Sequence, residues 1–398
     1  MPEAFLVGGA RTPVGRYGGA LSSVRPDDLA ALVVKEAVQR AGVPSDVVDE
    51  VIVGNANGAG EENRNVARMA WLLAGFEDSV PGITVNRLCA SGMSAIIMAS
   101  HMIKAGAADV VVAGGVESMS RAPWVMAKPT TAFAKPGDVF DTSIGWRFVN
   151  PIFQAQEKTT YSMPETAEEV ARVDSISRED ADAFAAGSQE KALAAIAAGR
   201  LADEIVPVTV KTRKGETVVD TDEGPREGTT TEVLSKLRPV VTGGSVVTAG
   251  NASSLNDGAS AIVVASEAAI QKYGLTPRAR IADGASAGVP APIMGIGPVP
   301  ATHKVLDRTG WNLGDIGAVE LNEAFATQSL ACIRRLGLDP SIVNNDGGAI
   351  ALGHPLGSSG SRIAITLLGR MEREGADKGL ATMCVGVGQG TALLLERV

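Results

Sequence analysis

Two cysteines and a histidine, each beside glycines, are the residues of this sequence best suited to covalent chemistry. Cys89 lies in NRLCASGMSA, His354 in GGAIALGHPLGSSG and Cys384 in TMCVGVGQG. A thiolate is a strong nucleophile, an imidazole can take its proton, and a second thiol can move another proton. These residue types predict a covalent mechanism in which one cysteine is acylated and the other transfers protons.

Cys89 is expected at the start of a helix, where unpaired backbone N–H groups and the helix dipole favour the thiolate. Its small neighbours Ala90, Ser91 and Gly92 leave room for a substrate carbonyl. Taken alone, the stretch also fits a small cysteine buried in the core. His354 favours the nucleophile, because an imidazole could remove the thiol proton and later steady the charge; a histidine on a surface turn is the alternative.

Two further stretches could contribute polar groups to the same chemistry. Asn322, in ELNEAFA, could orient a water or an imidazole, although an ordinary helix N-cap is the better explanation from the local sequence. The glycine turn after Cys384 could supply backbone N–H groups to an oxyanion hole, or simply end a core strand. The small polar loop TAGNASSLNDGASA, residues 248–261, could line a channel for a pantetheine arm; a tight loop is the alternative.

The elements that must position these residues alternate between strand and helix. Residues 25–42 predict a helix, 48–57 a strand, 95–106 a helix and 109–119 a strand. This order predicts α/β units around a mainly parallel sheet, whose ligands bind at the carboxyl ends of strands. All four candidates follow such strand ends.

The pattern also predicts the domain organisation. Residues 121–244 carry more charge, proline and threonine, with a helix capped by Ser177 and Asp180, and predict a loop domain covering the active site. We expect an N-terminal core domain of residues 1–120 plus 245–273 and a C-terminal core domain of residues 274–398. In each half a reactive residue opens a helix and the next strand ends in a glycine turn, which indicates a duplicated unit.

Composition narrows the class of protein. The 398 residues carry a net charge of −9, which argues against a nucleic-acid partner held by bulk charge. The most apolar run, residues 87–104, is too short and too polar for a membrane span, and the N-terminus has no signal-peptide pattern. The three cysteines and three histidines lack disulfide or metal-ligand spacing, so we expect no metal and a reducing cytoplasm.

The motifs quoted above, together with ARTPVGRYGGAL near the N-terminus, resemble those of the thiolases, and the resemblance covers essentially the whole chain. It implies an α/β fold, a duplicated αβαβα layered sandwich with an inserted loop domain. It also implies a homodimer or homotetramer acting on CoA thioesters by ping-pong chemistry. Coenzyme A is then a co-substrate, and no cofactor is bound permanently.

The resemblance assigns roles residue by residue. Cys89 matches the acylated nucleophile, His354 the residue that activates it, and Cys384 the general acid/base. Asn322 matches the holder of a water that stabilises the enolate with His354, and the backbone N–H groups of Cys89 and Gly386 match the second oxyanion hole. Further matches are CoA-contacting and pocket-lining positions: Arg226, Ser253, Met163 and Phe325.

One departure bears on the substrate. Ser162, in YSMPETAE, occupies the place of a histidine found in many short-chain biosynthetic thiolases. The stretches DTSIGWRFVNP and SMPETAE are instead similar to the β-ketoadipyl-CoA thiolases, which cleave 3-oxoadipyl-CoA to succinyl-CoA and acetyl-CoA. A distal carboxylate calls for a basic group, and Arg147 is the candidate; a surface ion pair is the alternative.

Other functions stay open at this point. A general acetyl-CoA acetyltransferase acting on acetoacetyl-CoA and a fatty 3-ketoacyl-CoA thiolase share the motifs. A ketosynthase-like condensing enzyme shares the fold but would use two histidines with its cysteine. A non-catalytic CoA-ester-binding protein would not need Cys89, His354 and Cys384 together.

Overall fold

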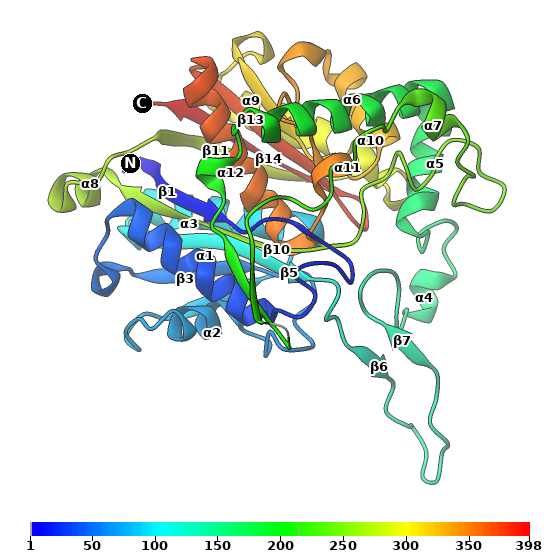
Figure 1. The fold of residues 1–398 in the computed structure, drawn as a ribbon, viewed down its shortest axis with the longest axis horizontal. Helices are drawn as coiled ribbons and strands as arrows, with labels where there is room; N and C mark the ends of the chain where they lie inside the picture. Colours follow the sequence, from blue (N-terminus) through cyan, green and yellow to red (C-terminus); the bar gives the residue numbers. More distant parts are fainter. Residues whose placement is uncertain (1, 214) are drawn as a thin grey trace.

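A ten-stranded sheet runs through the computed structural model, which describes residues 2–213 and 215–398 (Figure 1). The strand order is β12-β13-β14-β11-β1-β10-β5-β3-β4, with β2 paired to β10. In chain order these strands are β1 (Ala4–Arg11), β2 (Gly15–Arg16), β3 (Glu50–Gly54), β4 (Gly82–Val85), β5 (Val110–Ser118), β10 (Asn256–Ser266), β11 (Ala279–Gly288), β12 (Ala318–Leu321), β13 (Lys378–Val385) and β14 (Gln389–Arg397).

The two halves of the sheet repeat one pattern, which confirms the predicted duplicated fold. The first half runs β1-β10-β5-β3-β4 and the second β11-β14-β13-β12, with a parallel bridge from Val319 to Val343 in the place of a fifth strand. In each half the first two pairings are antiparallel and the following ones parallel. The halves join where β1 pairs antiparallel with β11.

The expectation of a mainly parallel sheet is wrong. Only β3–β4, β3–β5 and β12–β13 are parallel among the pairs of described strands in this sheet. Parallel neighbours need a long crossover, whereas a short turn joins antiparallel strands. β13 and β14 are joined by such a turn, in which Val387 and Gly388 adopt φ of 61° and 80°. β10 returns antiparallel after the insertion, and nothing local in the sequence specifies that direction.

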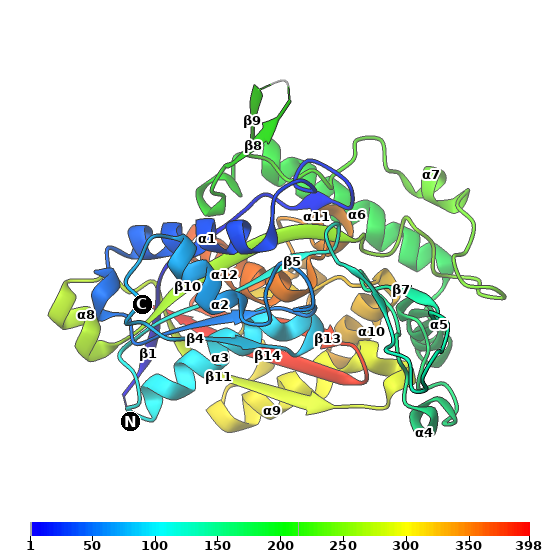
Figure 2. The same cartoon turned by 90° about the horizontal axis from the view of Figure 1, so that it is seen from below.

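Helices and strands alternate in five layers. Along β3, Val51 and Val53 enter an outer apolar cluster while Ile52 enters the central one, as the two-residue repeat of a strand requires. Figure 2 shows α1 and α9 on opposite sides of the strands. The outer helices include α1 (Pro26–Ala41), α2 (Val66–Leu73), α8 (Glu267–Tyr273), α9 (Pro298–Thr309) and α10 (Ala326–Leu336).

Two helices, α3 (Ser91–Lys104) and α12 (Leu356–Glu374), form the central layer, one from each half. They touch through glycines. A Cβ at Gly92 would lie 2.5 Å from Ser361 Oγ and 2.7 Å from Gly357 O, and one at Gly360 would lie 2.4 Å from Met93 N. Because no side chain fits there, the N-terminal ends of the two helices meet closely.

The segment between β5 and β10 packs mainly on the C-terminal half. It comprises the β6–β7 hairpin (Trp124–Met126 and Val139–Asp141), which projects from the body in Figure 1, together with α4 (Pro151–Gln154), α5 (Met163–Asp174), α6 (Arg178–Ala197), the β8–β9 hairpin (Val208–Thr212 and Gly215–Val219) and α7 (Thr231–Ser235). The helices α5 and α6 share apolar contacts with α10 and α11 (Ala349–Leu352). Within residues 2–213 and 215–398, no helix is long and apolar enough to cross a bilayer.

Ser162, which replaces the expected loop histidine, caps a helix. Its Oγ accepts from the backbone N–H of Glu165 at 3.4 Å, and its own N–H donates to Glu165 Oε2 at 2.7 Å. This capping box starts α5 directly before Met163. The serine therefore sets where the helix begins.

Candidate active site

Cys89 and His354 occupy equivalent places at the starts of the two central helices. Cys89 lies in the short 3₁₀ turn Leu88–Ala90 that runs into α3, and His354 lies two residues ahead of α12. Since α3 and α12 meet near Gly92 and Gly357, the two turns come together at one end of the sheet. The expected pairing of a nucleophile with a base is therefore geometrically available.

Cys89 is half-buried as a residue, and its sulfur receives hydrogen bonds from the backbone N–H groups of Gly386 and of Cys89 itself. Burial of the sulfur nevertheless raises the pKa of this thiol to about 11, and the carboxylate of Glu117 raises it further. The helix-start expectation identified the favourable N–H groups but not the larger desolvation. At neutral pH, Cys89 is a thiol that needs a base.

His354 is held in its neutral form. Its Nδ1 lies 2.6 Å from Ser359 Oγ, and the Ser359 hydroxyl donates its one proton to the carbonyl of Pro355 at 2.9 Å. Nδ1 must therefore carry the ring proton and donate to Ser359. Burial and the nearby Arg362 lower the pKa of His354 to about 3, so Nε2 is an unprotonated acceptor at neutral pH.

Asn322 faces that nitrogen from the end of β12. Its Nδ2 lies 3.5 Å from His354 Nε2. Its Oδ1 is buried and has no hydrogen-bond partner among the described residues. A buried acceptor in this state is commonly satisfied by an ordered water, which is the group that the family resemblance implies.

Cys384 lies at the end of β13, buried opposite Gly390 of β14. Burial raises the pKa of its thiol well above the usual value, and the electrostatic effect of Cys89 adds to the shift, which indicates that the two sulfurs are neighbours. Met163 and Phe325 share its apolar cluster. Cys384 is thus a protonated thiol near Cys89 and the predicted acyl pocket.

Gly386 lies against Leu88, the residue before Cys89, and near Met163. A Cβ there would lie 3.0 Å from Leu88 Cδ1 and 3.9 Å from Met163 Sδ. The turn after β13 therefore passes directly beside the turn that carries Cys89, which allows its N–H to reach the sulfur.

Of the predicted binding residues, Ser253 lies close to this centre. Its N–H and Oγ both lie 3.0 Å from the Ala324 carbonyl, which ties the 248–255 loop to the segment between Asn322 and Phe325. Arg226 has an exposed side chain, and its backbone N–H donates to Gln189 Oε1 at 2.9 Å. The structure gives Arg226 no contact with the catalytic candidates.

Arg147 is half-buried and makes no ion pair or side-chain hydrogen bond with any other residue that the structure describes. Its neighbour Trp146 donates from Nε1 to the carbonyl of Tyr161 at 3.1 Å, two residues before Met163. The surface ion pair considered as an alternative is absent within the described ranges. Arg147 is held near the start of α5 without a partner.

The sequence analysis missed three residues that hold the site. Ser359 fixes the ring of His354, Asn256 Oδ1 accepts from the His354 backbone N–H at 2.8 Å, and the carboxylate of Glu117 lies near Cys89. Ser359 follows His354 on the first turn of a predicted helix, so its proximity could have been inferred. Asn256 is too distant in sequence to leave a local signal.

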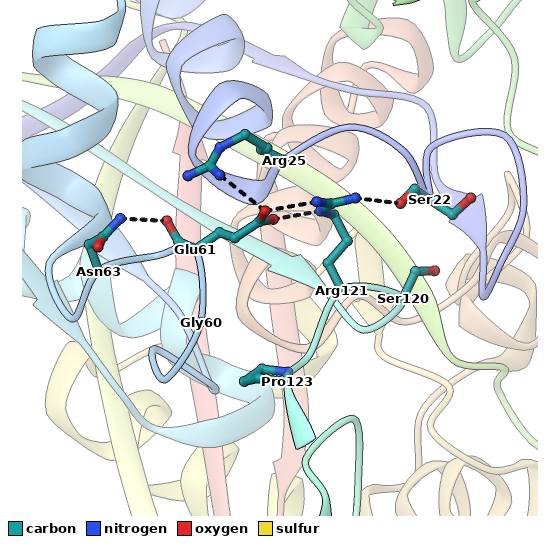
Figure 3. A pocket seen from close by; sticks show the side chains of 8 residues that line it. All are labelled: Ser22, Arg25, Gly60, Glu61, Asn63, Ser120, Arg121 and Pro123. Carbon is teal, nitrogen blue, oxygen red and sulfur yellow. Dashed lines mark hydrogen bonds and ion pairs between the residues drawn. The ribbon is translucent and has the colours of Figure 1, made fainter. Parts of the chain in front are cut away.

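A separate open pocket of about 500 Å³ lies at the base of the β6–β7 hairpin (Figure 3). Glu61 accepts there from Arg25 at 3.0 Å and from Arg121 at 2.5 Å and 2.7 Å. Arg121 also reaches the carbonyl of Ser22 at 3.3 Å. None of the predicted site residues lines this pocket, and its ion pairs anchor the hairpin to the loop after β3.

The chain matches the profiles of the thiolase N-terminal domain over residues 4–268 and of the thiolase C-terminal domain over residues 275–397. It is 56% identical to a β-ketoadipyl-CoA thiolase of Pseudomonas aeruginosa, covering 100% of this chain and 99% of the relative. It is 55% identical to a 3-oxoadipyl-CoA/3-oxo-5,6-dehydrosuberyl-CoA thiolase of Escherichia coli K12, with both chains fully covered.

Its fold superposes on the crystal structure of the Bacillus anthracis acetyl-CoA acetyltransferase with a TM-score of 0.94 and 43% identity, covering 100% of this chain and 99% of that one. The similarity extends over both halves, the central helices and the turns that carry the two cysteines and the histidine. On these grounds the chain belongs to the thiolase family and is an acyltransferase.

Proposed function

We propose that this thiolase cleaves 3-oxoadipyl-CoA with free CoA, giving succinyl-CoA and acetyl-CoA. The observation that supports the reaction is that Cys89 and His354 lie in turns just ahead of α3 and α12, which touch at Gly92 and Gly357. Cys89 is a neutral thiol, His354 has an unprotonated Nε2 that can accept a proton, and Cys384 supplies a second thiol near Cys89. The substrate is supported by the two relatives above, whose names specify β-ketoadipyl-CoA and 3-oxoadipyl-CoA.

In the first half-reaction, His354 Nε2 takes the Cys89 proton and the sulfur attacks the 3-keto carbon. The N–H groups of Cys89 and Gly386 stabilise the resulting oxyanion. The C2–C3 bond then breaks, leaving succinyl-Cys89 and the enolate of acetyl-CoA. The protonated His354 and a water on Asn322 stabilise the enolate oxygen, and the Cys384 thiol protonates its carbon.

In the second half-reaction, the Cys384 thiolate removes the proton of the incoming CoA thiol. The CoA sulfur attacks succinyl-Cys89, and Cys89 leaves as a thiolate that takes its proton back from His354. All protons are therefore returned to their starting positions at the end of the cycle. The two substrates react in turn on one sulfur, so the kinetics are ping-pong.

Arg147 is the proposed ligand for the distal carboxylate. A guanidinium stays charged at all relevant pH values, and this one has no partner among the residues described. The hydrogen bond from Trp146 to Tyr161 ties its segment to the start of α5, where Met163 faces the site. A charge-assisted hydrogen bond of about 1.5–3 kcal/mol would favour the dicarboxylic substrate by roughly 10- to 150-fold.

The surrounding assignments belong to the same proposal. Residues 121–244 act as the loop domain over the site, supported by the placement of Met163 beside Cys384. Arg226 and Ser253 contact CoA, which is a co-substrate with no permanent cofactor beside it, and Phe325 lines the acyl pocket. We further propose a homodimer or homotetramer that works in the cytoplasm.

A substrate panel tests the assignment. We compare kcat/KM for 3-oxoadipyl-CoA with that for 3-oxohexanoyl-CoA, which has the same chain length but lacks the terminal carboxylate, and with that for acetoacetyl-CoA. Arg147→Gln should lower kcat/KM for 3-oxoadipyl-CoA alone. Arg172→Gln, which removes an exposed arginine of the same insertion, is the matched control. A strong preference of the unmodified enzyme for acetoacetyl-CoA would refute the assignment and favour a general acetyl-CoA acetyltransferase.

A further inference from the structure

Glu117, at the end of β5, links the two halves of the enzyme behind the active site. Its side chain is buried, and Oε2 accepts from two backbone N–H groups, those of Ala56 and Gly357, each at 2.9 Å. Ala56 belongs to the loop after β3 in the first half. Gly357 belongs to the first turn of α12 in the second. One carboxylate oxygen thus joins segments from both halves.

On the histidine side, the contact fixes the start of α12. A Cβ at Gly357 would lie 2.4 Å from Val116 O and 2.8 Å from Glu117 Oε2, and one at Gly115 would lie 1.9 Å from Gly357 O. The helix therefore rests on the backbone of β5 with no space between them. Since His354 is three residues before Gly357, the position of its backbone follows from this contact.

On the cysteine side, the connection runs through Asn86. Asn86 Nδ2 donates to the Ala56 carbonyl at 2.9 Å, and Asn86 Oδ1 accepts from the Leu88 N–H at 2.8 Å. Leu88 adopts a left-handed φ of 47°, which a leucine holds only when its surroundings enforce it. A chain of hydrogen bonds therefore runs from Glu117 through Ala56 and Asn86 to Leu88, the residue before Cys89.

The charge of Glu117 also reaches the nucleophile. Burial is the largest cause of the raised pKa of the Cys89 thiol, and the carboxylate of Glu117, which disfavours a thiolate, adds a smaller increase. The carboxyl itself is faced by the N–H groups of Ala56, Asn57 and Gly357 and by the carboxylate of Glu62, and burial raises its pKa to about 7. The thiol is faced by the backbone N–H groups of Gly386 and of Cys89 itself and by the Cys384 thiol.

We propose that Glu117 is a positioning residue for the thiolase reaction: its carboxylate, which accepts from the N–H groups of Ala56 and Gly357, sets the turns that carry Cys89 and His354 relative to each other. Its Oε2 accepts from backbone N–H groups of Ala56 and Gly357, and no hydrogen bond joins its side chain to Cys89, His354 or Cys384 within the described residues. The inference rests on the nucleophilic role proposed above for Cys89 and not on the choice of acyl substrate.

The charge is tested by measuring the pH dependence of iodoacetamide alkylation at Cys89, located by peptide mass spectrometry, in the full-length enzyme. Glu117→Gln keeps a hydrogen-bond acceptor and loses the charge, so its alkylation profile should move to lower pH. The alkylation rate at pH 8 should rise by up to about threefold, which corresponds to roughly half a pKa unit, because Glu117 contributes less than burial to the pKa of this thiol. Glu50→Gln is the control, because Glu50 lies at the start of β3 and Ala56 follows the other end of that strand; it should leave the pH profile of alkylation unchanged.

The positioning is tested with Asn86→Ala, which breaks the path to Leu88 and keeps the charge. We expect a lower kcat for acetoacetyl-CoA thiolysis, an unchanged alkylation profile and a cooperative thermal unfolding transition. A wild-type kcat in Asn86→Ala, or identical alkylation profiles for Glu117→Gln and wild type, would overturn the inference. Labelling that does not occur at Cys89 would instead overturn the proposed role of that cysteine.

Discussion

Replacing Ser359 with alanine should impair the base without touching the nucleophile. Ser359 accepts from His354 Nδ1 at 2.6 Å, and this bond fixes the tautomer that leaves Nε2 free. Without the acceptor, a buried N–H is unpaired, which costs about 1–3 kcal/mol, and the ring can move its proton to Nε2. Since 1.4 kcal/mol corresponds to a factor of ten, kcat/KM should fall by about 5- to 150-fold.

The assay is steady-state thiolysis of a 3-oxoacyl-CoA, with Ser361→Ala as the control. Ser361 lies on the same helix, and its hydroxyl lies 2.6 Å from Ser260 Oγ rather than near His354. We expect Ser361→Ala to keep kcat/KM within about twofold and Ser359→Thr to recover most of the activity. Equal losses in Ser359→Ala and Ser361→Ala, or no loss in Ser359→Ala, would refute the account of the histidine.

Three further predictions concern stability. Arg11→Ala should lower the free energy of unfolding by about 3–5 kcal/mol in urea titrations, because it leaves two buried carboxylate partners uncompensated; an unchanged midpoint would contradict this. Gly92→Ala should destabilise the protein, since its Cβ would meet the facing helix at 2.5 Å, whereas Gly187→Ala on α6 meets nothing within 4 Å and should stabilise it by about 0.5–1 kcal/mol. The pKa of Glu117 in the folded protein, about 7, exceeds its ordinary value of 4.5. The folded state therefore holds this proton more tightly, and the resulting stabilisation is full below pH 4.5 and is lost as pH rises to 7. Glu117→Gln should reduce the fall in unfolding free energy over this pH range by up to roughly 3 kcal/mol. Equal pH dependence in both proteins would refute that contribution.

The order of elements could be read from the sequence because apolar periodicity and helix caps are local signals. Ser177 and Asp180 predict a capped helix start, and in the structure Ser177 Oγ accepts from the Asp180 N–H at 3.0 Å where α6 begins. Strand direction is not local: β10 returns after a long insertion, and its antiparallel pairing with β5 depends on contacts across the whole first half. The expectation of a mainly parallel sheet failed for that reason.

In the candidate site, too, some features could be predicted from the local sequence and others depend on the tertiary structure. Cys89, His354 and Cys384 stand out because each lies beside glycines at the end of a strand or the start of a helix. The protonation state of Cys89 could not be predicted from the sequence. The helix start favours the thiolate, but burial, which depends on the fold, raises the pKa of the thiol to about 11. Asn256 lies almost 100 residues before His354 and reaches it only through the tertiary structure.

The central claim is that Cys89 carries the acyl group of a dicarboxylic substrate. The most direct measurement is mass spectrometry of the tryptic peptide of residues 88–104 after the enzyme is mixed with 3-oxoadipyl-CoA in the absence of free CoA. The account predicts a succinyl thioester on Cys89 that disappears as succinyl-CoA forms when CoA is added. Full turnover with no acyl group on Cys89, or with the acyl group on another residue, would contradict it.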